Sequence, residues 1–184
     1  MMEQDYVQTV SAVIREVEST VLTLAPAAVE RLIDALVKAK RVFFAGAGRS
    51  RMMLGSVAMR LMHIGLTAHV VGEATAPAIG KGDLLVVASG SGETSTIVTI
   101  AAKAGRAGAG VALITLNEAS TLASVSDICL AFSDQSIKES VQIGAAAFEQ
   151  ATLIMGDALV CLTAQRLGIA DPNRLMGELH SNLE

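Results

Sequence analysis

Cysteine, aromatic residues and proline are scarce in this sequence. Its 184 residues include two cysteines, three prolines and no tryptophan, and aromatic side chains make up 3% of the chain. Cys129 and Cys161 form no Cys-x-x-Cys motif, and with only three histidines the chain lacks the ligand spacing of structural zinc or of a redox pair. We therefore interpret both cysteines as buried thiols and expect no metal site.

Long apolar runs and clusters of positive charge are missing as well. Charged residues or glycine interrupt every apolar stretch before the roughly 20 residues that cross a bilayer, and the first five residues lack the basic start of a secretory signal. The 14 basic residues are dispersed and outnumbered by 18 acidic ones, for a formal net charge of −4. Nucleic-acid binding needs a concentrated basic surface. The sequence thus predicts a cytoplasmic protein with neither a membrane nor a nucleic-acid partner.

Aliphatic residues, in contrast, are abundant. Hydrophobic residues make up 52% of the chain, above the average for soluble proteins. A chain of this length without a shift in composition is expected to fold as one domain, residues 1 to 184, which buries about two thirds of its unfolded surface. We interpret the surplus of apolar side chains as an interface between subunits.

From residue 42 onward, short apolar segments alternate with amphipathic ones. The strands predicted are 42 to 45, 67 to 71, 84 to 88, 111 to 116 and 128 to 132, and the helices between them are 50 to 64, 94 to 107 and 120 to 125. Near-continuous apolar strands joined by helical crossovers indicate a parallel sheet with both faces covered. The predicted fold class is α/β, with a five-stranded parallel sheet in the order 2-1-3-4-5 flanked by helices.

Helices are also predicted on both sides of this region. Apolar residues recur at helical spacing up to Val21 and again after Pro26, which predicts an N-terminal helical hairpin. A polar loop at 133 to 140 leads into a long apolar helix from about 141 to 167. Because one sheet face cannot cover such a helix, we expect it to pair with the N-terminal helices or with the same helix of another subunit.

Two loops rich in glycine and hydroxyl groups follow the first and third predicted strands. They read Gly46-Ala47-Gly48-Arg49-Ser50 and Ser89-Gly90-Ser91-Gly92-Glu93-Thr94. Where a loop of small residues leads into a helix, backbone N–H groups and hydroxyl oxygens can bind an anion such as phosphate. In a sheet of order 2-1-3-4-5, both loops line the crevice at the carboxyl ends of strands 1 and 3.

Each loop also has a simpler interpretation. In the first, Ser50 can cap the helix and donate to phosphate while Arg49 adds a charge-assisted hydrogen bond, or the segment is an ordinary tight turn. In the second, the hydroxyl groups of Ser89, Ser91 and Thr94 can satisfy a phosphate monoester without a metal, or they are redundant caps. The convergence of both loops on one crevice favours phosphate.

Glu149 is the first candidate for a catalytic role. It interrupts the apolar stretch 145 to 151, where a carboxylate is partly removed from water and suits a general base, although a helix-surface glutamate is the commoner case. His180 lies in the C-terminal segment, where a histidine is usually a solvated tail residue. His63 and His69 are interpreted as packing residues.

Two further motifs are Met59-Arg60-Leu61-Met62-His63 and His180-Ser181-Asn182-Leu183-Glu184. Together with the two loops and Phe148-Glu149-Gln150, they resemble the sugar isomerase (SIS) domain family, and within it the 6-phospho-3-hexuloisomerases. The resemblance spans nearly the whole chain. The serine-glycine loop is shared by most such domains and indicates only a phosphosugar, whereas these two motifs select the hexuloisomerases.

The resemblance implies isomerisation of D-arabino-3-hexulose 6-phosphate to D-fructose 6-phosphate through a cis-enediol, without a metal or an organic cofactor. The residues that it assigns to the substrate phosphate are Gly48, Arg49, Ser50, Ser89, Ser91 and Thr94. Glu149 is implied as the base, and His180 as the group for ring opening or oxygen protonation, in its own or a neighbouring subunit's site. The family also implies a homotetramer, built as a dimer of dimers, and functional coupling to a hexulose-phosphate synthase.

Two alternatives and three departures accompany this resemblance. Another phosphosugar aldose–ketose isomerase, such as arabinose 5-phosphate isomerase, uses the same loop and enediol chemistry but often has extra regulatory domains. A non-catalytic phosphosugar sensor would need a DNA-binding partner, since the sequence has no basic helix-turn-helix segment. The chain departs from the family where Arg51 replaces a glycine, where 143 to 147 is rich in alanine and glycine, and where Leu179 replaces an arginine.

Overall fold

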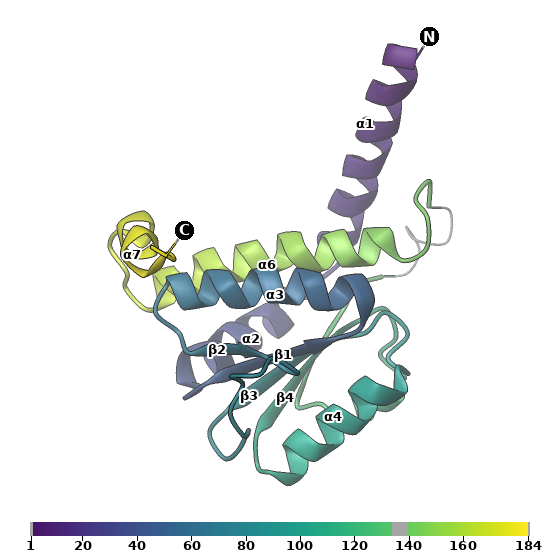
Figure 1. Cartoon of the computed structure of the whole chain (residues 1–184). Helices are drawn as coiled ribbons and strands as arrows, with labels where there is room; N and C mark the ends of the chain where they lie inside the picture. The colour runs from purple at the N-terminus through teal and green to yellow at the C-terminus, as the bar shows by residue number, and fades with distance from the viewer. Residues whose placement is uncertain (1, 134–139, 184) are drawn as a thin grey trace.

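Five short parallel strands form the centre of the fold, as seen in a computed structural model that describes residues 2–133 and 140–183 (Figure 1). The strands are β1 (Val42–Gly46), β2 (Ala68–Val70), β3 (Leu84–Ala88), β4 (Gly110–Thr115) and β5 (Ile128–Ala131). They lie in the order β2-β1-β3-β4-β5, and every neighbouring pair is parallel. The predicted fold class and strand order are confirmed.

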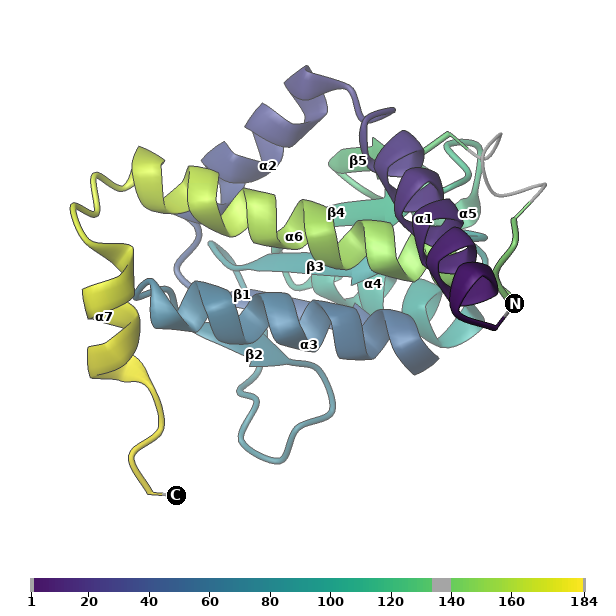
Figure 2. The ribbon, with the colours of Figure 1, turned by 90° about the horizontal axis from the view of Figure 1, so that it is seen from above.

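Helices cover both faces of this sheet. The helices of the described residues are α1 (Met2–Val21), α2 (Pro26–Lys38), α3 (Gly48–His63), α4 (Ser95–Arg106), α5 (Thr121–Ser124), α6 (Ala146–Arg166) and α7 (Pro172–Leu179). Viewed from above, α2, α6 and α3 lie across one face, and α4 lies beneath the sheet on the other (Figure 2). The result is a three-layer arrangement of helices, sheet and helix.

The alternation of side chains along each strand divides the apolar residues into two cores. In β1, Val42 and Phe44 point toward α2, α3 and α6, whereas Phe43 and Ala45 point toward α4. The other inner strands divide in the same way, so that both faces of the sheet are buried. This explains why the strands appear in the sequence as continuous apolar runs.

Helices α3 and α6 contact each other closely. A Cβ atom added to Gly156 of α6 would lie 2.2 Å from a methyl group of Val57 in α3, so glycine is needed at this contact. The two helices run in the same direction, and their first turns lie at the same end of the molecule (Figures 1 and 2). The contact therefore fixes the start of α6 relative to the start of α3.

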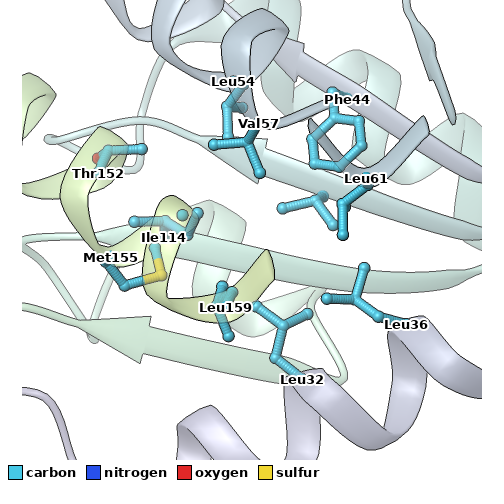
Figure 3. Close-up of a pocket in the computed structure, with 12 residues that line it drawn as sticks. Leu32, Leu36, Phe44, Leu54, Val57, Leu61, Ile114, Thr152, Met155 and Leu159 are labelled. Atoms are coloured by element: carbon cyan, nitrogen blue, oxygen red, sulfur yellow. The ribbon is translucent and has the colours of Figure 1, made fainter. Parts of the chain in front are cut away.

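A small apolar cavity remains in the core between these helices and the sheet (Figure 3). Its volume is about 10 Å³, and Leu54, Leu61 and Met155 are among the side chains that line it. A void of this size holds at most about one water molecule. It is a packing defect of the core and offers no room for a substrate.

The first two helices are present as predicted, but they diverge from each other. α2 packs on β5 and α6, whereas α1 crosses the beginning of α6 and its N-terminal half projects away from the sheet (Figure 1). The long helix α6 begins at Ala146 rather than near residue 141. Gly144 precedes it with a φ of 65°, a left-handed conformation that cannot continue a helix. The polar loop predicted at 133 to 140 lies largely outside the described residues.

Helix α6 is long and apolar enough, by length and composition, to cross a membrane. Its apolar window is 56% buried, and its inward stripe includes Ala151, Met155 and Leu159 in the core shared with the sheet. This arrangement is that of a core helix in a globular fold. The interpretation of Cys161 as a buried thiol is wrong, because Cys161 lies outside this stripe and is exposed. Cys129 in β5 is half-buried, and burial raises the pKa of its thiol.

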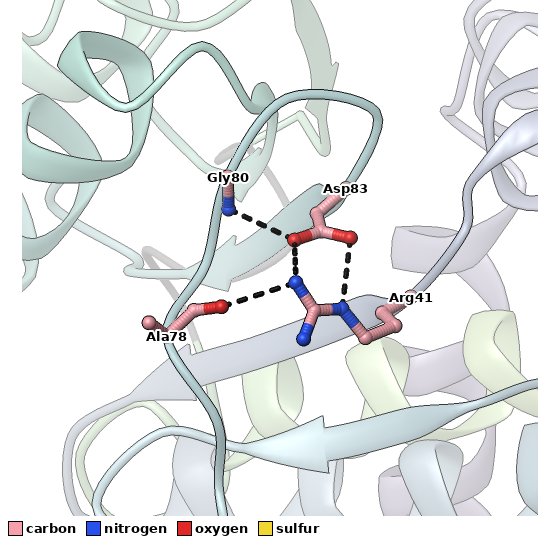
Figure 4. A network of polar contacts seen from close by, with 4 residues as sticks. All are labelled: Arg41, Ala78, Gly80 and Asp83. Atoms are coloured by element: carbon pink, nitrogen blue, oxygen red, sulfur yellow. Dashed lines mark hydrogen bonds and ion pairs between the residues drawn. The ribbon is translucent and has the colours of Figure 1, made fainter.

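An ion pair joins the segments that lead into β1 and β3 (Figure 4). Arg41 donates from Nε to Asp83 Oδ1 at 3.0 Å and from Nη2 to Oδ2 at 2.7 Å, and Nη2 also donates to the carbonyl of Ala78 at 3.1 Å. The N–H of Gly80 donates to Asp83 Oδ2 at 2.8 Å. The hydrogen bonds from Arg41 are the main reason that the pKa of Asp83 is lowered. The network ties the loop after β2 to the sheet.

We expect Asp83→Asn to reduce the free energy of unfolding by about 1–3 kcal/mol at neutral pH, because a buried charge-assisted network loses its charge. The folded pKa of Asp83 is lowered, so its contribution is complete above the ordinary aspartate pKa of about 3.9 and disappears as the pH falls toward the folded value. Urea unfolding of wild type and variant at pH 7 and near pH 3 tests this. A stability difference that stays constant between the two conditions would contradict it.

Candidate active site

The parallel register brings the two glycine-rich loops together. Gly46 at the end of β1 pairs with Ala88 at the end of β3, so the loops that follow leave the sheet side by side. A Cβ atom on Gly46 would lie 2.9 Å from the backbone nitrogen of Arg51, so only glycine fits the tight turn from β1 into α3. The two loops thus lie next to each other, as the predicted crevice requires.

The first loop is shorter than predicted. The N-cap of α3 is Ala47, and Gly48, Arg49 and Ser50 already belong to its first turn. The prediction that Ser50 caps the helix is therefore wrong: the tight turn at Gly46 starts the helix early, so that Ser50 is its third residue and is only 9% exposed. Arg49 is exposed at the mouth of the loop.

The second loop is held by its own hydroxyl groups. The Ser89 and Thr94 oxygens lie 2.9 Å apart, and Ser89 Oγ also accepts a hydrogen bond from the N–H of Gly92 at 3.2 Å. Ser91 Oγ accepts from the N–H of Glu93 at 3.2 Å, and the Ser91 side chain is exposed. Buried Ser89 thus shapes the loop from within, whereas Ser91 presents its hydroxyl group at the surface.

The helices that begin around these loops have no side-chain caps. In the described chain, neither α3, α4 nor α6 has an N-cap side chain that accepts a hydrogen bond from the first turn. α2, which begins away from the loops, also lacks such a cap, whereas Ser120 caps α5 beside the second loop and Asp171 caps α7. Uncapped first turns leave N–H donors free, and the helix dipole makes the same position attractive to negative charge. The uncapped first turns of α3, α4 and α6 therefore lie around the two loops.

The end of β4 and the segment after it support the second loop, a contact that the sequence did not predict. Thr115 Oγ1 donates to the carbonyl of Gly90 at 3.2 Å, and the carboxylate of Glu93 accepts from the N–H of Thr121 at 2.7 Å. The hydrogen bonds from Thr121 lower the pKa of Glu93. In the sequence, the polar residues that follow the strand predicted at 111 to 116 were the signal that could have indicated this support.

Glu149 lies at the first turn of α6, next to both loops. Its Oε2 atom is 2.6 Å from Nε of Arg49, in a contact that lacks the alignment of a hydrogen bond. The neighbouring Phe148 borders the second loop, since a Cβ atom on Gly90 would lie 3.6 Å from its ring. The Glu149 side chain is 13% exposed. The structure thus brings the predicted base together with the residues predicted to bind phosphate.

His180 lies at the other end of the molecule. Its ring stacks on His63 in the last turn of α3, with ring centroids 5.4 Å apart. Since α3 rises about 1.5 Å per residue, His63 is about 20 Å from Arg49 along the helix. His63 is buried and lines a cavity of about 430 Å³ between α3, α6 and α7; desolvation, then Arg60 and His180, lower its pKa. Within one chain, His180 therefore lies far from Glu149 and from both loops.

Comparison with known proteins identifies the family of this fold. The family model of the SIS domain matches residues 35–162, which include β1, β3, both loops and Glu149. The chain belongs to the SIS domain family. The two loops and the first turn of α6 are the parts of this SIS domain that surround the crevice.

Relatives of this SIS domain share most of its length. A protein from Mycobacterium gastri named 3-hexulose-6-phosphate isomerase is 42% identical over 160 residues, which cover 84% of this chain and 80% of that protein. A protein of the same name from Bacillus subtilis (strain 168) is 34% identical over 181 residues, 95% of this chain and 97% of that protein. A crystal structure from Methanococcus jannaschii, whose description infers the function of a 3-hexulose-6-phosphate isomerase, is 27% identical with a TM-score of 0.83, over 96% of this chain and 99% of that one.

Gly92 tests the shape of the second loop. It has a φ of 69°, and a Cβ atom there would lie 2.0 Å from Ser120 Oγ, so we expect Gly92→Ala to lower the free energy of unfolding by about 1–3 kcal/mol. Gly105 in the last turn of α4 has open space for a methyl group, and Gly105→Ala should instead stabilise by up to about 0.5–1 kcal/mol. Urea unfolding of both variants measures the difference. Equal effects would mean that the left-handed turn is not required.

Proposed function

We propose that this chain is a 6-phospho-3-hexuloisomerase, which interconverts D-arabino-3-hexulose 6-phosphate and D-fructose 6-phosphate in the cytoplasm. Two relatives named 3-hexulose-6-phosphate isomerase, at 42% and 34% identity over most of the chain, support the substrate class. The observation that carries the proposal is the position of Glu149, a carboxylate that is 13% exposed and lies in the first turn of α6 beside both loops. No metal or organic cofactor takes part in the proposed reaction.

The phosphate of the substrate binds between the two loops in this proposal. The residues that hold it are Gly48, Arg49, Ser50, Ser89, Ser91 and Thr94. The free N–H donors of α3 and α4 and the exposed hydroxyl group of Ser91 support this assignment. Phosphate binding remote from the reacting carbons supplies orientation, so that the chemical step needs few groups.

Glu149 is the proposed general base. Its carboxylate takes the proton from C2 of the 3-hexulose, the C–H electrons form the double bond of a cis-enediol between C2 and C3, and the same carboxyl group returns the proton to C3. The carbonyl group thereby moves from C3 to C2. The first turn of α6 stabilises negative charge at this position through its free N–H groups.

A second subunit supplies the proton for the sugar oxygens in this proposal. Apolar side chains are exposed on the outer face of the two long helices, including Met52 and Met59 of α3 and Ile154 and Leu162 of α6. A two-fold axis across the middle of these helices would place the end of the partner that carries α7 over this chain's crevice. His180 of the partner subunit would then complete the site that Glu149 begins.

The proposed assembly is a homotetramer, a dimer of dimers. Helix α1 supports a second interface, because Tyr6, Val7 and Ile14 are exposed on it and a cavity of about 520 Å³ lies between α1 and α6. Apolar surface of this extent is typical of contacts between subunits. The proposed function also couples the enzyme to a hexulose-phosphate synthase, since that reaction forms its phosphorylated ketohexose substrate.

Glu149→Gln is the direct test of the proposed reaction. The amide keeps the shape of the side chain but cannot accept the proton, so kcat should fall by at least about 100-fold while fructose 6-phosphate still binds. Solvent deuterium should enter C3 of fructose 6-phosphate with the wild type and not with the variant. Glu30→Gln on α2, remote from the crevice, is the matched control and should keep wild-type turnover. A wild type that binds fructose 6-phosphate without any exchange would instead be a sensor.

Mixing two inactive variants tests the shared site. If Glu149 and His180 act from different subunits, Glu149→Gln and His180→Ala are each inactive alone, and mixed oligomers regain about one quarter of wild-type activity, because half of the random dimers contain one intact site of two. The variants are unfolded and refolded together, and their activity is compared with that of each refolded alone. No recovery in folded mixed oligomers would place His180 outside the reaction.

A further inference from the structure

Arg49 lies between the proposed phosphate site and the proposed base. It belongs to the first turn of α3, among the residues that we assign to the substrate phosphate, yet its Nε atom lies 2.6 Å from Oε2 of Glu149. Oε2 is buried and forms no hydrogen bond with any residue that the structure describes. The contact is therefore an ion pair without directional bonding, and Arg49 supplies the only positive charge paired with this carboxylate in the described residues.

The two partners differ in how firmly they are held. The Glu149 side chain is 13% exposed and stands on α6, which the close contact of Gly156 with Val57 fixes against α3. The Arg49 side chain is 52% exposed, and its terminal Nη groups have no protein acceptor within residues 2–133 and 140–183. The carboxylate is thus the fixed member of the pair, and the guanidinium group is the member that can move.

A substrate phosphate would compete for this guanidinium group. Phosphate carries more charge than a carboxylate and accepts two parallel hydrogen bonds from arginine, which the present contact with Glu149 does not provide. A half-buried carboxylate that loses its counter-ion holds a proton more strongly. Removal of Arg49 from Glu149 therefore makes the carboxylate a stronger base at the moment when phosphate occupies the crevice.

We propose that Arg49 is a counter-ion exchanged between Glu149 and the phosphate of the substrate, so that a phosphorylated sugar activates the base and an unphosphorylated sugar does not. This inference rests on the proposed function and names the specificity of the same site. Arg49 gains and loses no proton in the exchange, and the C–H proton still passes to Glu149 and back to the adjacent carbon. Arg49 is in this sense a positioning residue, since it acts on the reaction through Glu149.

Activation of the base by phosphate can be measured when the substrate is replaced by two separate molecules, D-fructose for the sugar and phosphite dianion for the phosphate. In deuterated buffer, unphosphorylated D-fructose should exchange its C3 proton slowly with the wild type, and added phosphite dianion should accelerate the exchange at least about tenfold. Arg49→Gln should exchange D-fructose about three- to tenfold faster than the wild type without phosphite, because the base has lost its counter-ion. Phosphite should change the rate of this variant by less than about twofold.

Matched variants distinguish the exchange of Arg49 between two partners from phosphate binding alone and from orientation of Glu149 alone. Arg49→Lys retains a mobile positive charge and should keep both the slow basal exchange and part of the phosphite activation. Arg106→Gln removes an exposed arginine from the last turn of α4 and should behave as the wild type. If Arg49 only binds phosphate, Arg49→Gln will lose activation with its basal rate unchanged, and if it only orients Glu149, the basal rate will fall. Either result overturns the proposal.

A crystal structure with inorganic phosphate provides a readout that does not depend on activity. We expect Arg49 to contact the bound phosphate through its Nη groups, with Nε more than 4 Å from Glu149 Oε2, compared with 2.6 Å in this structure. Phosphate bound in the crevice with the ion pair intact would overturn the exchange even if the enzyme isomerises its substrate. A wild type that never exchanges the C3 proton of fructose 6-phosphate would overturn the proposed function alone, since the movement of Arg49 is seen directly.

Discussion

The close contact between α3 and α6 at Gly156 and Val57 determines where the chemistry of this fold can occur. The parallel sheet places the two glycine-rich loops at the carboxyl ends of β1 and β3, but the proposed base lies outside it. The proposed base, Glu149, is on α6, a helix that is not part of the alternating strand and helix pattern. Because Gly156 lets the side chain of Val57 in α3 pack directly against the backbone of α6, the first turn of α6 is held beside the first loop. Glu149 is within reach of the crevice for this reason.

The sequence predicted the sheet and the crevice well, because both depend on local patterns. Apolar runs of four to six residues followed by glycine-rich turns determine the strands, their order and the position of the loops. The start of each helix was harder to predict, since it depends on backbone dihedral angles. Gly46 allows α3 to begin early, so that Ala47 and not Ser50 is its N-cap, and Gly144 delays α6 to Ala146.

Contacts between distant segments could not be predicted from one sequence. The pairing of Arg49 with Glu149 joins residues 100 positions apart, and the support of the second loop by the segment after β4 depends on how two loops fold against each other. The same limit applies to His180, whose place beside His63 is set by the packing of α7 on α3. Composition did indicate the apolar surface of α1, α3 and α6, without showing which helices would carry it.

Contacts at three positions along helix α6 determine where it lies. Glu149 stands at its first turn, Gly156 contacts α3 near its middle, and Arg166 at its end pairs with Glu30 and Asp34 of α2. One inserted residue turns a helix by about 100° and lengthens it by about 1.5 Å. An insertion between Glu149 and Gly156 would therefore rotate the carboxylate away from the crevice, and the buried ring of Phe148 would rotate with it. The length of this segment is consequently as constrained as the identity of any side chain in it.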